Sequence, residues 1–135
     1  MADTVIGIDS STTSTKAIAW DASGKNIAEG SIPLSTFSPV MGYYEQNAED
    51  WWNSAAGALK KITQKINNES IRGLAISNQR ETFVGLDNKG NPVRPAIIWL
   101  DERCKCIVDK FAGIVGDDRI HQLTGKPKDY APVVY

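Results

Sequence analysis

Apolar residues in the first third of the chain occur in short runs that are separated by turn residues. These runs cover residues 5–8, 16–21 and 26–34. The segment DASGK at 21–25 has the composition of a tight turn between the second and third runs. Strands joined by short turns pair with their neighbours, so the pattern predicts a three-stranded antiparallel meander. Pro33 and Pro39 end the pattern, and we expect an irregular loop to follow.

Beyond this loop the apolar spacing changes to three and four, which is typical of a helix. Asn47 is a favourable helix cap, and the acidic residues that follow it suit the positive end of a helix dipole. The periodic apolar positions are Trp51, Ala55, Leu59, Ile62 and Ile66. They predict one amphipathic helix with a single apolar face.

The second half of the chain predicts further strands and helices. Strands are expected at 71–77, 82–87 and 96–100, with the turn NKGNP between the last two. Asp101 is predicted to cap a helix that carries the apolar residues of 107–115. A short helix over 117–123 is expected to stop at Gly125. No repeat or linker is visible, so the chain is interpreted as one domain or part of one.

The predicted order of elements is three meandering strands, a helix and a further strand. This order is similar to the beginning of the ribonuclease-H-like fold, from which sugar kinases, actin and the heat-shock ATPases build their nucleotide clefts. The expected fold class is therefore α/β, with a mixed sheet and flanking helices.

Composition and charge narrow the class of protein. The 135 residues carry 15 Lys and Arg against 16 Asp and Glu, which does not indicate a basic nucleic-acid surface. No apolar stretch approaches the roughly 20 residues that span a bilayer, and no signal peptide is visible. Cys104 and Cys106 lie two positions apart, which is unsuitable on a helix for a mutual disulfide or a shared metal. Reduced thiols in a cytoplasmic protein are the interpretation that fits best.

The turn between the first two strands concentrates hydroxyl groups. Asp9 ends the first strand, six Ser and Thr residues follow at 10–15, and Lys16 begins the second strand. Backbone N–H and hydroxyl groups in such a turn bind phosphate oxygens, and Asp9 is suited to hold Mg²⁺. A plain polar hairpin explains the residues equally well. The P-loop and the G-x-G-x-x-G motif are both absent.

Four segments together resemble one enzyme family, the FGGY carbohydrate kinases. They are GIDSSTTSTKAIAWD at 7–21, YYEQNAEDWW at 43–52, ISNQRETFV at 76–84 and PAIIWLDER at 95–103. The first resembles the family's phosphate loop, and the third resembles its glycerol-kinase-like branch. Their order and spacing agree with the family, and they span nearly the whole chain.

On the nucleotide side, the resemblance implies ATP and Mg²⁺ as cofactors. Thr12, Thr13 and Ser14 would contact the phosphates of ATP. Lys16 would place a positive charge near them, and Asp9 would be the carboxylate associated with magnesium.

On the acceptor side, the resemblance implies a small sugar or polyol as the substrate. Arg80 and Glu81 would hold its hydroxyl groups, because a guanidinium donates hydrogen bonds and a carboxylate accepts them. Trp99 would pack against its carbon skeleton, and Asp101, together with Arg103, would support the site. Considered alone, Arg80 and Glu81 also fit an exposed ion pair, and Trp99 also fits a core residue.

Three positions depart from the glycerol kinase pattern. Ser11 replaces a glycine in the phosphate loop, Leu100 replaces a glutamine after Trp99, and Tyr130 is displaced by one position from the family's tyrosine. These departures weaken the case for glycerol itself, and a different polyol or a ketose is also compatible with the sequence.

The family's proteins are several times longer than this chain. Residues 1–135 are therefore interpreted as the N-terminal part of the first FGGY domain, an interpretation that their apolar end at 132–135 supports. The catalytic base is expected beyond residue 135, so no catalytic residue is assigned here and the isolated fragment is expected to be inactive. A homo-oligomer of the full-length protein is compatible with this interpretation.

Two other functions stay open at this point. GIDSS at 7–11 is also similar to the start of ribonuclease-H-like nucleases, which need further carboxylates near Asp9 and usually a basic surface. A non-catalytic sugar-binding relative would contain the same motifs. Salt-sensitive DNA binding would distinguish the nuclease from the kinase.

Overall fold

The computed structural model describes residues 3–131. Their contacts form two compact units. Unit 1 consists of the residues up to Ser35 together with Asn47–Gln79, and unit 2 consists of Thr36–Gln46 together with the residues from Arg80 onward. The apolar residues at 132–135, which the fragment hypothesis above cites, lie outside the described residues.

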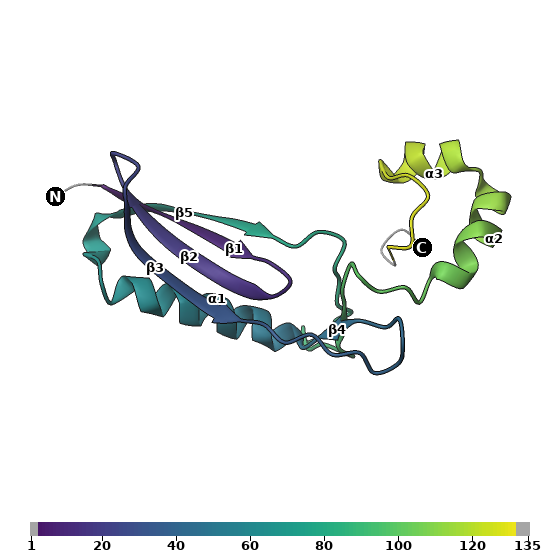
Figure 1. The fold of residues 1–135 in the computed structure, drawn as a ribbon, viewed down its shortest axis with the longest axis horizontal. Helices are drawn as coiled ribbons and strands as arrows, with labels where there is room; N and C mark the ends of the chain where they lie inside the picture. The colour runs from purple at the N-terminus through teal and green to yellow at the C-terminus, as the bar shows by residue number, and fades with distance from the viewer. Residues whose placement is uncertain (1–2, 132–135) are drawn as a thin grey trace. The chain divides into compact units, whose positions relative to one another are not determined.

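Unit 1 is built on a four-stranded mixed sheet (Figure 1). Strands β1 (Thr4–Ser10), β2 (Ser14–Asp21) and β3 (Asn26–Pro33) form the predicted antiparallel meander. Strand β5 (Ile71–Asn78) pairs in parallel with β1, so that the strand order is β3-β2-β1-β5. The meander and the strand predicted at 71–77 are thereby confirmed.

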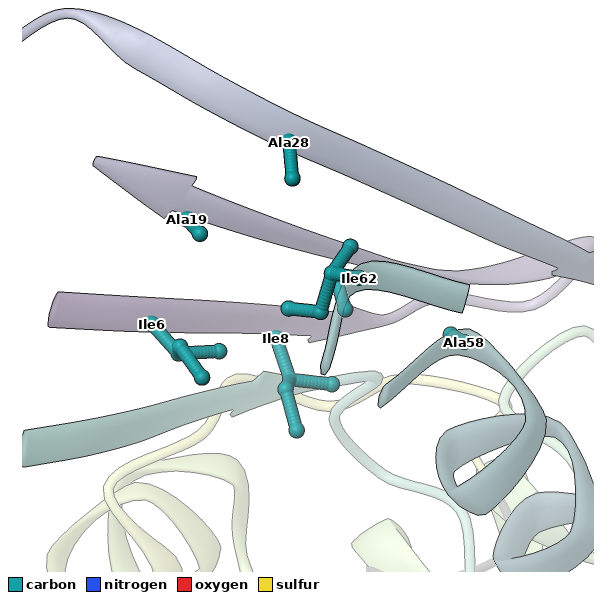
Figure 2. Packing of buried hydrophobic residues seen from close by; sticks show 7 residues of the cluster. Ile6, Ile8, Ala19, Ala28, Ala58 and Ile62 are labelled. Atoms are coloured by element: carbon teal, nitrogen blue, oxygen red, sulfur yellow. The ribbon is translucent and has the colours of Figure 1, made fainter. Parts of the chain in front are cut away.

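Helix α1 (Ala48–Thr63) lies along one face of this sheet (Figure 1). The predicted cap is confirmed, because the Asn47 side chain accepts a hydrogen bond from the Glu49 amide at 3.2 Å. Alternate residues of β1, β2 and β3 face α1 and pack against its Ala58 and Ile62 (Figure 2). The buried cluster consists of Ile6, Ile8, Ala17, Ala19, Ala28, Ala58 and Ile62.

The close packing of α1 requires a glycine in β3. A Cβ atom on Gly30 would lie 2.7 Å from the Lys61 Cβ and 2.8 Å from the Ala58 carbonyl oxygen. The buried face of α1 overlaps the predicted one. Its buried residues are Ser54, Ala58 and Ile62, and the predicted Leu59 and Ile66 are partly buried and pack against the same core.

Unit 2 has less regular structure. Two short strands, β4 (Glu45–Gln46) and β6 (Ala96–Ile97), pair antiparallel. Helices α2 (Lys105–Val115) and α3 (Asp117–Thr124) follow. The predicted stop of the last helix is confirmed, because Gly125 adopts the left-handed conformation (φ 71°) at the C-cap of α3.

Three local predictions for unit 2 are wrong. The segment 82–87 forms isolated bridges instead of a strand, and the strand expected at 96–100 ends at Ile97. Pro92 and Pro95 provide no backbone N–H, which limits pairing between these segments. Asp101 does not cap a helix, because α2 begins at Lys105 with Cys104 at its N-cap.

None of the helices within residues 3–131 combines the length and the apolar character that crossing a bilayer demands.

Candidate functional site: a hydroxyl turn and a charged acceptor segment

The hydroxyl turn at Ser11–Thr13 connects β1 to β2 and is fixed by hydrogen bonds. The Ser11 amide and hydroxyl both donate to the Ser14 carbonyl, at 3.0 and 2.9 Å. The Thr12 hydroxyl donates to the Gln79 side-chain oxygen at 3.2 Å, and the Gln79 amide donates to the Ser10 carbonyl at 3.0 Å. The turn is thus attached both to itself and to the residue that follows β5.

A buried pair of hydroxyl groups attaches the stem of the turn to α1. The Thr15 Oγ1 lies 2.7 Å from the Ser54 Oγ and 3.3 Å from the Ser10 Oγ, and Thr15 is completely buried. Ser54 in turn donates to the Trp51 carbonyl at 3.0 Å. Sequence reasoning gave Thr15 and Ser54 no separate roles. A hydroxyl residue at an inward-facing strand position, next to Ala17, is the signal that would have identified Thr15.

Asp9 and Lys16 occupy paired positions of β1 and β2, on the sheet face opposite α1. The Lys16 ammonium forms an ion pair with Glu29 of β3, with 3.2 Å between Nζ and Oε1. Within residues 3–131 the exposed Asp9 carboxylate has neither a hydrogen-bond nor an ion-pair partner. Its oxygens are therefore available to an ion or to water.

The acceptor candidates Arg80 and Glu81 lie in unit 2. Arg80 is exposed. Glu81 has a φ of 62°, and it is the one non-glycine residue with positive φ in the described part of the chain. Its carboxylate forms an ion pair with Lys126 instead of Arg80, so the simple Arg80–Glu81 ion pair is not what the structure contains.

Trp99 is 46% exposed, so it is not the core residue that its apolar neighbours suggested. Its backbone amide donates to the Thr82 hydroxyl at 3.2 Å. Because Thr82 directly follows Glu81, this bond links Trp99 to the segment that carries Arg80 and Glu81.

Asp101 lies in the interior of unit 2, where it is 1% exposed. Its Oδ2 accepts from the Tyr44 amide at 2.7 Å and from the Arg103 Nη2 at 2.8 Å. Its Oδ1 accepts from the Arg103 Nε at 2.7 Å and from the Arg103 amide at 2.9 Å. Burial acts to raise the pKa of Asp101, but the hydrogen bonds from Arg103 and Tyr44 outweigh burial and lower it.

Arg103 connects Asp101 to a second buried carboxylate. Its Nη2 lies 2.7 Å from Glu45 Oε1, and Glu45 also pairs with Arg94. The Tyr43 ring packs 4.3 Å from the guanidinium carbon. The hydrogen bonds that Arg103 donates to the Asp101 carboxylate are the main reason why the pKa of Arg103 is raised. Glu45 lies in the quoted segment YYEQNAEDWW, but only the tertiary structure identifies its partners.

Similarity to known proteins decides the family. Residues 4–133 match the N-terminal domain of the FGGY family of carbohydrate kinases. The chain belongs to this family. It is 36% identical over 130 residues to a glycerol kinase from Leifsonia xyli subsp. xyli, covering 94% of this chain and 26% of that protein. It is 33% identical over 120 residues to a xylulose kinase from Staphylococcus xylosus, covering 89% of this chain and 25% of that one.

The FGGY fold is equally clear among solved structures. A gluconate kinase from Lactobacillus acidophilus superimposes with a TM-score of 0.87 at 26% identity, covering 98% of this chain and 26% of that one. The α/β fold expected from the element order is thereby confirmed. The chain spans about a quarter of the length of the curated relatives that it matches.

Two of the residues that depart from the glycerol kinase pattern have defined contacts in this FGGY chain. Ser11 needs no left-handed backbone conformation, and its hydroxyl closes the turn on Ser14. Tyr130 places its ring 5.3 Å from the Lys105 ammonium, at the beginning of α2.

The structure groups the predicted site residues by unit. Asp9, Thr12, Thr13, Ser14 and Lys16 all lie on the first hairpin of unit 1. In unit 2, Arg80, Glu81 and Trp99 belong to neighbouring segments, while Asp101 lies in the interior.

Proposed function

We propose that this chain supplies the phosphate loop and part of the acceptor site of an ATP-dependent kinase that phosphorylates a hydroxyl group of a sugar or polyol. The observation that carries the proposal is the hydroxyl turn of an FGGY chain, held by Ser14 and Gln79 beside the exposed Asp9 carboxylate. A turn fixed in this way needs little rearrangement to receive a phosphate group.

In this proposal the chain's own residues bind and orient ATP. Thr12, Thr13 and Ser14 contribute hydroxyl and amide groups toward the phosphates. Lys16 adds positive charge, although its ion pair with Glu29 divides that charge between the two partners. We also place the protein in the cytoplasm, where ATP is available.

Asp9 suits Mg²⁺ of the kind that accompanies ATP. Mg²⁺ keeps several waters and takes one or two carboxylates together with phosphate oxygens, so one exposed carboxylate is a sufficient protein contribution. Residues 3–131 contain no cluster of three His, Cys, Asp or Glu side chains suited to a metal, which agrees with an ion held mainly by ATP and water. When bound, the ion would neutralise charge on the transferred phosphoryl group.

The acceptor is proposed to meet Arg80, Glu81 and Trp99. Arg80 donates hydrogen bonds to its oxygens, Glu81 accepts from its hydroxyl groups, and the exposed Trp99 covers its C–H surface. Asp101 has four hydrogen bonds and 1% exposure, so we assign it to positioning the segment that follows Trp99 instead of touching the acceptor. The base that removes the acceptor's proton is expected outside these 135 residues.

The test uses the polypeptide encoded by the reading frame that contains this sequence. Polyols, ketoses and sugar acids are offered with ATP and Mg²⁺, and ADP release is followed. Arg80→Ala should raise the KM for the acceptor at least about tenfold, because a charge-assisted hydrogen bond is lost. Arg72→Ala is the matched control, since Arg72 is an exposed arginine of unit 1 that pairs with Asp3. Absence of turnover on every acceptor, with folded protein, would contradict the proposal.

A second pair of variants tests the phosphate loop. Thr13→Val removes an exposed hydroxyl of the turn and should raise the KM for ATP without changing that for the acceptor. Thr63→Val removes a hydroxyl at the end of α1 and should change neither the KM for ATP nor the KM for the acceptor. Equal effects of the two variants would argue against ATP binding at the turn.

A further inference from the structure

Glu81 is held in a backbone conformation that glutamate rarely adopts. Its φ of 62° lies in the left-handed region, which is sterically unfavourable for a residue other than glycine. Such conformations persist only where surrounding contacts impose them. Contacts of the Glu81 side chain therefore help to hold this backbone conformation.

The side-chain contact in question comes from Lys126, which lies 45 positions further along the chain. The Lys126 ammonium pairs with Oε1 of Glu81, and the two side chains are 32% and 20% exposed. A pair that is mostly removed from solvent holds its geometry better than an exposed surface pair does. No second partner of the Glu81 carboxylate occurs among residues 3–131, so Oε2 is open to accept a hydrogen bond.

The cap of α3 fixes the backbone from which Lys126 extends. Gly125 turns the chain in the left-handed conformation, and the Lys126 amide donates to the Thr124 hydroxyl at 3.0 Å. That hydroxyl itself donates to the Ile120 carbonyl at 2.8 Å, and Ile120 is 2% exposed. The lysine is thus presented from a helix end that is anchored in the core of unit 2.

We propose that Lys126 is a positioning residue of the acceptor site, where its ammonium group engages one oxygen of the Glu81 carboxylate and leaves the other to accept a hydrogen bond from an acceptor hydroxyl. This inference rests on the proposed function, and it adds to it a residue that the sequence motifs do not include. Without the ammonium group, the Glu81 side chain would gain rotational freedom, and binding an acceptor would have to restrict it again.

The test measures steady-state kinetics of the polypeptide from the same reading frame. Lys126→Met keeps the length of the side chain and removes its charge. We expect the KM for the acceptor to rise about tenfold and the KM for ATP to stay within about twofold. Lys126→Arg should restore the acceptor KM to within about threefold of the wild type, because arginine keeps the ion pair.

Two further variants separate this role from general stability. Lys128→Met removes a lysine only two positions away, whose ammonium group pairs with Asp109, and it should leave both KM values unchanged. In a Glu81→Gln background, Lys126→Met should have no further effect, because the two residues act as one unit. Circular dichroism establishes that each variant is folded.

The outcomes distinguish the two proposals. If the wild type turns over and Lys126→Met has the same KM for the acceptor, the role of Lys126 is overturned and the proposed function is not. A Lys126→Met effect that persists in full in the Glu81→Gln background would do the same. Wild-type protein that neither turns over nor binds any acceptor, as measured by calorimetry, would overturn the proposed function and the role of Lys126 with it.

Discussion

Replacing Asp101 with asparagine tests whether the buried charge network stabilises unit 2. The substitution keeps the shape of the side chain but turns one carboxylate oxygen into an NH₂ group. Four N–H groups converge on this carboxylate at 2.7 to 2.9 Å, so two of them would then face another donor. Losing two hydrogen bonds to a charged acceptor, at about 1.5–3 kcal/mol each, destabilises the protein by about 3–6 kcal/mol.

A loss of this size is a large part of the roughly 5–15 kcal/mol that stabilises a typical domain. Native-state hydrogen exchange shows which part of the chain loses stability. In Asp101→Asn the amides of Tyr44 and Ile98 should exchange much faster, while the amides of β1 and β2 in unit 1 should change less.

Asp87→Asn is the matched control, because Asp87 is an exposed carboxylate that also accepts backbone N–H bonds, at 2.8 Å from Lys89 and Asn91. Its effect should be clearly smaller, because solvent replaces the lost bonds. The reasoning would be refuted if the amides of Tyr44 and Ile98 exchanged equally slowly in wild type and Asp101→Asn. It would also be refuted if Asp101→Asn and Asp87→Asn lost the same stability.

Three further predictions concern stability. Gly30→Ala should lower the free energy of unfolding by about 1–3 kcal/mol, because its Cβ would lie 2.8 Å from a backbone oxygen of α1. Gly73→Ala is the control, because its Cβ meets open space, and thermal unfolding should show no such loss. Thr15→Val should lower the free energy of unfolding by about 1–3 kcal/mol, because the Ser54 hydroxyl loses the Thr15 hydroxyl that lies 2.7 Å away. An unchanged midpoint of urea unfolding would contradict this prediction. Because the pKa of Asp101 is lowered in the folded chain, its contribution is complete above its ordinary pKa of 3.8 and is lost as the pH falls below it. In acid unfolding, wild type should therefore lose more stability than Asp101→Asn as the pH falls through this range, in which other carboxylates such as Asp21 and Asp87 titrate in both proteins; parallel curves would exclude this.

The hairpins, the Asn47 cap and the stop of α3 follow from the sequence because local residues decide them. The turn at 21–25 is closed by its own Asp21, whose carboxylate accepts from the Ser23 and Lys25 amides at 2.9 and 3.1 Å. Asn47 and Gly125 likewise act on neighbouring residues. Such signals need no knowledge of the rest of the fold.

The wrong predictions have two physical causes. The segments at 82–87 and 96–100 have the composition of strands, but Pro92 and Pro95 limit their pairing. An aspartate before an apolar periodic segment has the pattern of a cap, and that pattern does not show that Arg103 and the distant Tyr44 hold Asp101 in the interior of unit 2. The same limit applies to Lys126, because nothing near it in the sequence indicates Glu81. Thr12, Thr13 and Ser14 were readily identified, since the whole loop is one continuous segment, and their contact with ATP stays a prediction.

Strand β5 has a consequence for handling the chain in solution. It hydrogen-bonds to β1 on one side, and within residues 3–131 no strand pairs with its other side. Leu74 and Ile76 on this strand are 48% and 64% exposed. An open edge with apolar side chains is a template for pairing with another chain, so we expect concentrated samples of this chain to aggregate through β5. A charged residue at position 76 should delay that aggregation more effectively than any change in the hydroxyl turn.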